Sequence, residues 1–84
     1  MDSALEEIDF LARSNHRVGV MEELTEGSRE RWELSDATGA SSPTMSRILT
    51  DFEERRWIVR DGPTYELTPL GEFVVERFFK LREG

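Results

Sequence analysis

The chain has 84 residues, which allows one small domain with a modest core and leaves no room for a second, substrate-binding domain. It contains no cysteine, so disulfides and thiolate metal sites are excluded, and the lone His16 cannot supply a ligand set. Its 18 acidic and 11 basic residues give a formal net charge of -7, whereas proteins that bind nucleic acids usually carry a basic surface.

The composition and the sequence of the chain also bear on its cellular location and on the salt concentration around it. No apolar stretch approaches the roughly 20 residues that a membrane-spanning helix needs, and Met1-Asp2-Ser3 lacks the basic start of a secretory signal. We therefore expect a cytoplasmic protein with no membrane partner. Ten of the 11 basic residues are arginines, and the acidic residues are spread along the chain, which suggests a salt-loving host. In molar salt the Debye length is about 3 Å, so an acidic surface repels another polyanion only near contact.

Two helices are expected in the first third of the chain. Apolar residues recur at helical spacing between Ala4 and Ala12, which predicts a helix over that range. A second apolar set lies three residues apart on one face and comprises Val18, Met21 and Leu24. Because Gly27 follows where a C-terminal glycine is common, the second helix is predicted over about Asn15–Thr25.

A short helix and a longer helix are expected next. The short helix covers about Arg31–Thr38 and ends at Gly39, whose freedom to take positive φ permits a sharp turn. Ser41 fits the N-cap and Pro43 the first turn of a helix over about Ser42–Arg55. The apolar residues of this longer helix form one narrow stripe: Met45, Ile48, Leu49 and Phe52.

The last third of the chain predicts a hairpin followed by a helix. Trp57–Arg60 and Thr64–Leu67 are β-prone, and the Asp61-Gly62 pair between them is a turn signal. Thr68 then caps a helix over about residues 69–82, with a proline in its first turn.

These elements define a mainly helical α+β chain with a three-helix core, a two-stranded β-hairpin wing and a C-terminal helix. Their order describes a single winged helix-turn-helix domain over residues 1–84. Its helix-turn-helix lies at about 31–55, its wing at about 57–67 and its C-terminal helix at about 69–82. In such domains the second helix of the helix-turn-helix enters the DNA major groove, so the longer helix is the expected reader.

The free face of the helix over 42–55 bears small polar side chains that let its backbone approach base edges, and Arg47 is its one residue able to bind guanine bidentately. The N-terminus of this helix also offers free N–H groups to a phosphate. Arg60 and Thr64, from the wing, are placed to contact the sugar-phosphate backbone or the adjacent minor groove, and Arg31, at the start of the short helix, is placed to contact another phosphate. The candidate DNA-binding residues are therefore Arg31, Ser42, Thr44, Ser46, Arg47, Thr50, Arg60 and Thr64.

Ordinary structural roles remain open for several side chains. Arg47 precedes Asp51 by four residues, and such a solvated pair is worth only about 0.3 to 0.5 kcal/mol. For Arg55, Arg56 and Arg60, the alternative to DNA contact is an ordinary surface charge that is offset by neighbouring carboxylates. Trp32 and Trp57 are interpreted as packing residues and not as platforms on which bases stack.

Short motifs between about Ile8 and Gly71 resemble haloarchaeal winged helix-turn-helix transcriptional regulators. The motifs are Glu33-Leu34, Ala37-Thr38-Gly39, Ser41, Pro43-Thr44, Arg47-Ile48-Leu49 and Asp51-Phe52-Glu53-Glu54-Arg55. The resemblance implies an N-terminal DNA-binding domain followed by a larger C-terminal effector domain. Ser42 stands where such sequences often have arginine, which removes a DNA contact. Arg56 stands where glycine is usual, so we expect the reading helix to run on there.

The terminal helices carry more apolar surface than one small domain easily covers. Val75 and Phe79 widen the apolar arc of the last helix, and Phe10 lies off the apolar face of the first. Three explanations remain open: the two helices cover each other within one chain, they form a homodimer seam, or they dock a further domain.

We therefore expect the sequence-specific, double-stranded DNA-binding domain of a transcriptional regulator, acting as a homodimer through its terminal helices. The alternative is a winged helix used as a protein–protein interaction module in the transcription machinery, with its acidic surface kept for a basic partner. No nucleophile–base pair, metal set or phosphate loop can be assembled from these residues, so we expect no enzyme activity, no catalytic residues and no cofactor.

Overall fold

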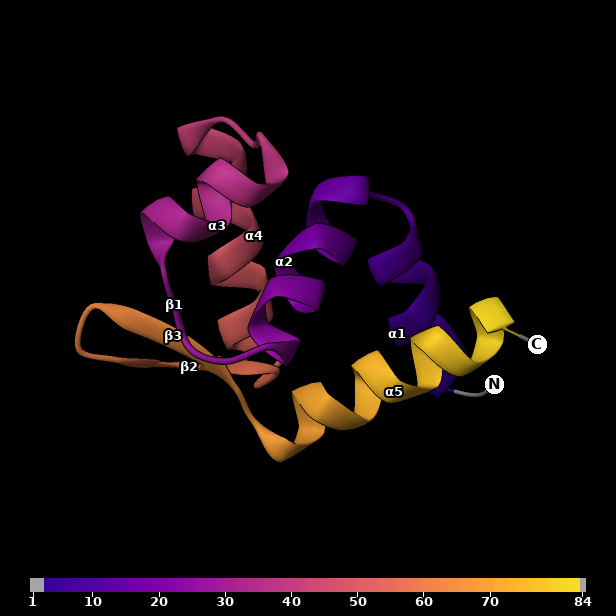
Figure 1. The fold of residues 1–84 in the computed structure, drawn as a ribbon. Coiled ribbons are helices and arrows are strands. Elements are labelled where there is room, and N and C mark those ends of the chain that lie inside the picture. Colours follow the sequence, from indigo (N-terminus) through magenta and orange to yellow (C-terminus); the bar gives the residue numbers. More distant parts are fainter. Residues whose placement is uncertain (1–2, 84) are drawn as a thin grey trace.

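A computed structural model of the chain describes residues 3–83, with side chains described for residues 6–81. The helices are α1 (Ser3–Ala12), α2 (Asn15–Thr25), α3 (Arg31–Thr38), α4 (Ser42–Glu54) and α5 (Pro69–Glu83), and the strands are β1 (Arg29–Glu30), β2 (Ile58–Asp61) and β3 (Thr64–Leu67). This order confirms the winged-helix prediction: α4 follows α3 across a sharp turn, the hairpin projects beyond the helices, and α5 returns beside α1 (Figure 1).

The wing differs from the predicted two-stranded hairpin by one strand. The sheet has the order β1-β3-β2, and both pairings are antiparallel. The added strand is only two residues long, with Arg29 opposite Tyr65 and Glu30 opposite Thr64. Two charged residues show no alternation of apolar and polar positions, so no periodicity marked them as a strand. Through β1 the sheet is continuous with the start of α3.

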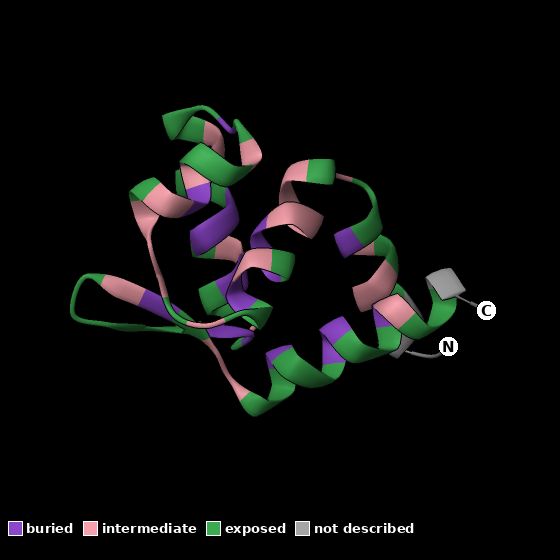
Figure 2. Cartoon of the chain, viewed as in Figure 1, coloured by how far each residue is buried: buried purple, intermediate pink, exposed green. Residues whose placement is uncertain are grey.

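All five helices and the hairpin contribute side chains to one core, whose buried positions face inward in Figure 2. Trp57 lies at its centre, 1% exposed, with its ring 5.1 Å from that of Phe52 and 5.9 Å from that of Phe10. The prediction that Trp57 is a packing residue is therefore confirmed. The same prediction is wrong for Trp32, which is 64% exposed.

The end of α4 also differs from the expectation. The helix stops at Glu54, Arg55 is its C-cap, and Arg56 takes a left-handed φ of 63°. The helix therefore does not run on past Arg56, although an arginine replaces the usual glycine. Continuing it would carry Trp57 away from the core, whereas the left-handed turn places the Trp57 N–H 3.0 Å from the Phe52 carbonyl and its ring inside.

The apolar residues of the terminal helices pack within this chain. Val75 is 4% exposed, and Phe10 and Phe79 are partly buried against the core. Helices α1 and α5 contact each other. The Phe10 ring packs on Trp57, and Val75 and Phe79 face residues of α2 and β3. The partner interface predicted for these three side chains stays a prediction. Among the helices of residues 3–83, none is long and apolar enough to cross a membrane.

Candidate nucleic-acid interface

The exposed face of α4 follows from how the helix is anchored. Its apolar stripe is buried in the core, so the opposite side of the helix faces outward. Ser42, Ser46, Arg47 and Thr50 are all exposed there. Between Gly39 and Thr50 the chain contains no acidic residue, which makes this stretch less negative than the chain as a whole.

Arg31 reaches from the first position of α3 to this face. Its Nη2 donates to the Ser42 carbonyl at 2.9 Å, to Ser42 Oγ at 3.2 Å and to Ser46 Oγ at 2.7 Å. The structure thus brings three of the predicted site residues into one cluster. Since the partners lie 11 and 15 residues further along the chain, this cluster depends on the crossing of α3 and α4.

Arg47 is exposed, and among the described residues it has no hydrogen-bond or ion-pair partner. The alternative surface pair with Asp51 is therefore not formed. Arg47 presents a free guanidinium on the outward face of α4, beside the small side chain of Ser46.

The first turn of α4 offers fewer backbone donors than a helix N-terminus usually does. Pro43 has no N–H, the Thr44 N–H donates to Ser41 Oγ at 3.3 Å, and the Met45 N–H donates to the Ser41 carbonyl. Thr44 is half-buried, and its hydroxyl accepts from Ser41 Oγ at 3.0 Å. Within the described turn only the Ser42 N–H is left for a phosphate.

The two wing residues are engaged in closing the hairpin. Arg60 Nε donates to the Gly62 carbonyl at 3.0 Å, and its guanidinium carbon lies 5.7 Å from the centre of the Tyr65 ring. Thr64 Oγ1 donates to the Asp61 carbonyl at 3.0 Å. Both residues belong to the hairpin that projects in Figure 1, and neither is among the hydrogen-bond partners of Arg31 in the described part of the chain.

Arg55 was considered above as an ordinary surface charge, but the structure gives it a structural role. Its Nη1 donates to the Glu7 carboxylate at 2.9 Å, and its guanidinium lies 3.5 Å from the centre of the Phe10 ring. It therefore joins α1 to the end of α4 and is turned away from the outward face.

Sequence reasoning missed Trp32 as a surface residue. It follows Arg31 at the start of α3 and stands 64% exposed. Leu34, two residues later, is the buried residue of α3. Two residues in a helix are about 200° apart, so the burial of Leu34 alone places Trp32 on the outward side. That signal was present in the sequence.

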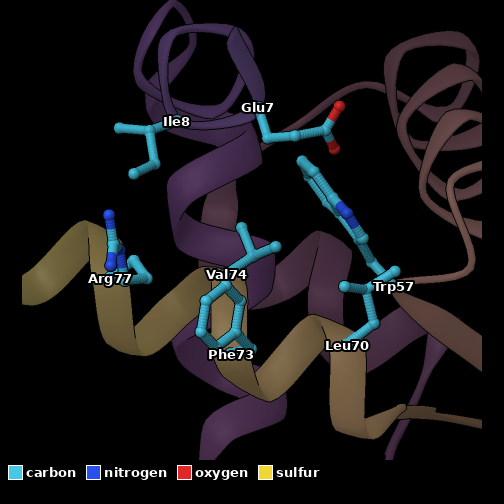
Figure 3. A pocket seen from close by; sticks show the side chains of 7 residues that line it. All are labelled: Glu7, Ile8, Trp57, Leu70, Phe73, Val74 and Arg77. Atoms are coloured by element: carbon cyan, nitrogen blue, oxygen red, sulfur yellow. The ribbon is translucent and has the colours of Figure 1, made fainter. Parts of the chain in front are cut away.

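A second candidate surface lies between α1 and α5. A cavity of about 160 Å³ lies there. Figure 3 shows Val74 and Phe73 on α5 between Trp57 on one side and Ile8 and Arg77 on the other, with Glu7 above. Large apolar side chains remain exposed along α5 here and beyond: Leu70 is 48%, Phe73 51% and Leu81 55% exposed. These residues are more exposed than Phe10, Val75 and Phe79, which were predicted to form the partner interface.

The fold and this arrangement define the class of winged-helix proteins, and solved structures agree. The crystal structure of ligand-free NadR superposes with a TM-score of 0.75 at 18% identity, over 93% of this chain and 63% of that one. An ArsR family transcriptional regulator, RHA00566, superposes with a TM-score of 0.66 at 19% identity, over 96% of this chain and 88% of that one.

The chain belongs to the family described as the HVO_A0261 N-terminal domain, which matches residues 5–84. The resemblance to haloarchaeal winged helix-turn-helix regulators is thereby confirmed at the level of family and fold. No curated protein sequence matches the chain significantly. The chain spans less than two thirds of the NadR chain, and at such low identities the two structures bear on the fold alone.

Proposed function

We propose that this chain is the DNA-binding domain of a transcriptional regulator and that α4 reads the major groove. The observation that carries the proposal is the outward face of α4, where Arg47 has no partner among the described residues and small side chains surround it. An α-helix fits the major groove, and arginine is the residue most often found bidentate on guanine. Both structural neighbours have this fold, and one is described as a transcriptional regulator.

In this proposal the site residues divide by what they touch. Arg47 and Thr50 face base edges, while Arg31 faces a phosphate. The wing residues Arg60 and Thr64 lie along the flanking sugar-phosphate backbone, where Arg60 uses the guanidinium donors that do not bond to Gly62.

The test is fluorescence anisotropy with labelled duplexes that tile the DNA upstream of the protein's own gene, in about 1 M KCl to screen the acidic surface. We expect one duplex to bind more tightly than a scrambled duplex. Arg47→Ala should lower that preference by about 1–3 kcal/mol. Arg13→Ala is the matched control, because Arg13 is an exposed arginine just after the end of α1, paired with Asp9 at 2.8 Å. Absence of preference for any duplex overturns the proposal.

A protein-interaction module is the second candidate, and the net charge of -7 favours it. In that case the acidic surface serves a basic partner, and the outward face of α4 has no role. Mixing the domain with a cationic peptide distinguishes the two candidates. Saturable binding of the peptide, together with no preference among duplexes, supports the module.

We also propose that two copies pair through the terminal helices, at the surface formed by Leu70, Phe73 and Leu81. Their spacing along α5 places them on one side of the helix beside the cavity, and burying exposed apolar surface drives association. To bind two half-sites, a two-fold pair has to hold its two reading helices about 34 Å apart, one turn of DNA. The description of the family as an N-terminal domain supports a C-terminal effector domain in the complete regulator.

Light scattering coupled to gel filtration tests the pairing. The domain is expected to elute with twice the mass of one chain, and Phe73→Glu is expected to halve it. Lys80→Glu is the control, because it also adds negative charge to an exposed part of α5, where Lys80 pairs with Glu76 at 3.4 Å. A single-chain mass for the unaltered domain at all concentrations refutes the pairing.

A further inference from the structure

The guanidinium of Arg31 is held by several contacts to α4, although it lies at the surface of the protein. Three acceptors from α4 meet at one nitrogen, Nη2, at 2.7 to 3.2 Å. Two of the three acceptors are the hydroxyls of Ser42 and Ser46, which stand four residues apart on the same side of α4. These contacts hold the guanidinium in one place before any ligand arrives.

The rest of the guanidinium is left open. A guanidinium has five N–H donors, and Nη2 carries two of them. The three on Nε and Nη1 of Arg31 have no acceptor among the described residues. Among the described residues Arg31 pairs with no carboxylate, unlike Arg13, Arg29 and Arg55. Neutral oxygens hold its guanidinium, although Glu30 and Glu33 flank Arg31 in the sequence.

A fork of free N–H donors on a cation that is in no ion pair matches the two oxygens of a phosphodiester. The neighbouring stretch of residues 39–50 has no acidic residue to repel that phosphate. Arginine normally loses rotamer freedom when it binds, and here the contacts to α4 have already restricted it.

We propose that Ser42 and Ser46 are positioning residues that hold Arg31 against a DNA backbone phosphate, and that they do not read bases. This inference rests on the proposed DNA-binding function and refines it. The Arg31 contact contributes affinity and register at any sequence, and base reading is confined to Arg47 and Thr50. Phosphate contacts of this kind do not carry sequence information directly.

The experiment compares the preferred and the scrambled duplex across KCl concentrations. Ser46→Ala is expected to weaken both by the same factor of about 3 to 10, leaving the ratio of their dissociation constants unchanged. Ser46→Thr keeps the hydroxyl and should restore both affinities. Arg31→Ala should weaken both duplexes and lower the slope of log affinity against log salt by about 1. The double variant Arg31→Ala/Ser46→Ala should bind no more weakly than Arg31→Ala.

Circular dichroism of each variant confirms that the domain remains folded, and Arg31→Lys, which keeps the charge but loses the fork, replaces Arg31→Ala if that variant unfolds. A change in the ratio of the two dissociation constants on Ser46→Ala overturns this inference while leaving the DNA-binding function in place. A further loss from Ser46→Ala in the Arg31→Ala background also overturns it. Failure of the unaltered domain to prefer any duplex refutes both.

Discussion

Among the described residues that are not glycine, Arg56 has a positive φ, at 63°. Its side chain forms no hydrogen bond or ion pair with another described group. A left-handed backbone costs a residue with a Cβ atom about 1–2 kcal/mol, whereas glycine takes it freely. We predict that Arg56→Gly raises the free energy of unfolding by about 0.5 to 1 kcal/mol, because glycine also gives the unfolded chain more freedom and so offsets part of the gain. Urea denaturation in constant salt measures the change.

Arg56→Ala is the control for Arg56→Gly. It removes the same charge but keeps the Cβ atom, so it should leave the free energy of unfolding nearly unchanged. The carbonyl of residue 56 accepts from Thr68 Oγ1 at 2.5 Å in every variant, since that contact uses the backbone. Equal stabilisation by alanine and glycine would show that charge, and not backbone strain, governs this position.

Single residues also show the limits of sequence reasoning at the site. Arg31 and Arg47 were both predicted as DNA-binding residues from their charge and position. That Arg31 bonds to Ser42 and Ser46 was beyond prediction, because partners 11 and 15 residues away depend on how two helices cross. The exposure of Trp32, in contrast, follows from its angle to Leu34 in one helix and could have been predicted.

The packing of α5 on the base of the wing depends on one glycine. A Cβ atom at Gly71 would lie 2.1 Å from the Trp57 carbonyl oxygen, a backbone atom that moves only if the end of α4 or the start of β2 moves. We predict that Gly71→Ala lowers the free energy of unfolding by about 1–3 kcal/mol through overpacking, although alanine favours a helix by about 1 kcal/mol over glycine. Thermal and urea unfolding measure it.

Glu72→Ala provides the comparison for Gly71→Ala, because Glu72 is exposed in the same turn of α5 and alanine adds no atom there. It is expected to change stability by less than about 0.5 kcal/mol. Full stability of Gly71→Ala would mean that α5 can shift on Trp57 without loss, contrary to the close contact described.

Elements were predicted well where a long pattern defined them. The helix α4 has four buried residues at helical spacing and a capping serine, and its start was placed correctly at Ser42. The strand β1 was missed because two residues carry no pattern and their pairing partner Tyr65 lies far along the chain. The end of α4 was misplaced because the turn at Arg56 is set by the burial of Trp57, which is a tertiary effect.

The balance of charge is a property of the whole molecule. Seven net negative charges lie on a chain with a radius of gyration of 12.0 Å. The Debye length is about 10 Å in about 0.1 M salt, so carboxylates repel one another across much of the molecule there. In about 1 M salt it is about 3 Å, and only adjacent charges interact. The compact state therefore suffers most from self-repulsion in dilute salt.

We predict that raising KCl from about 0.1 to 1 M increases the free energy of unfolding by about 1 kcal/mol, with NaCl equally effective, because screening does not depend on which monovalent cation is present. The triple variant E22Q/E26Q/E72Q removes three exposed carboxylates that have no ion-pair partner among the described residues. It changes the net charge from -7 to -4, since three negative charges are lost. Its stability in dilute salt should rise, and its dependence on KCl should shrink. An unchanged salt dependence in this variant would assign the effect to burial of apolar surface, which salts also strengthen, and not to charge.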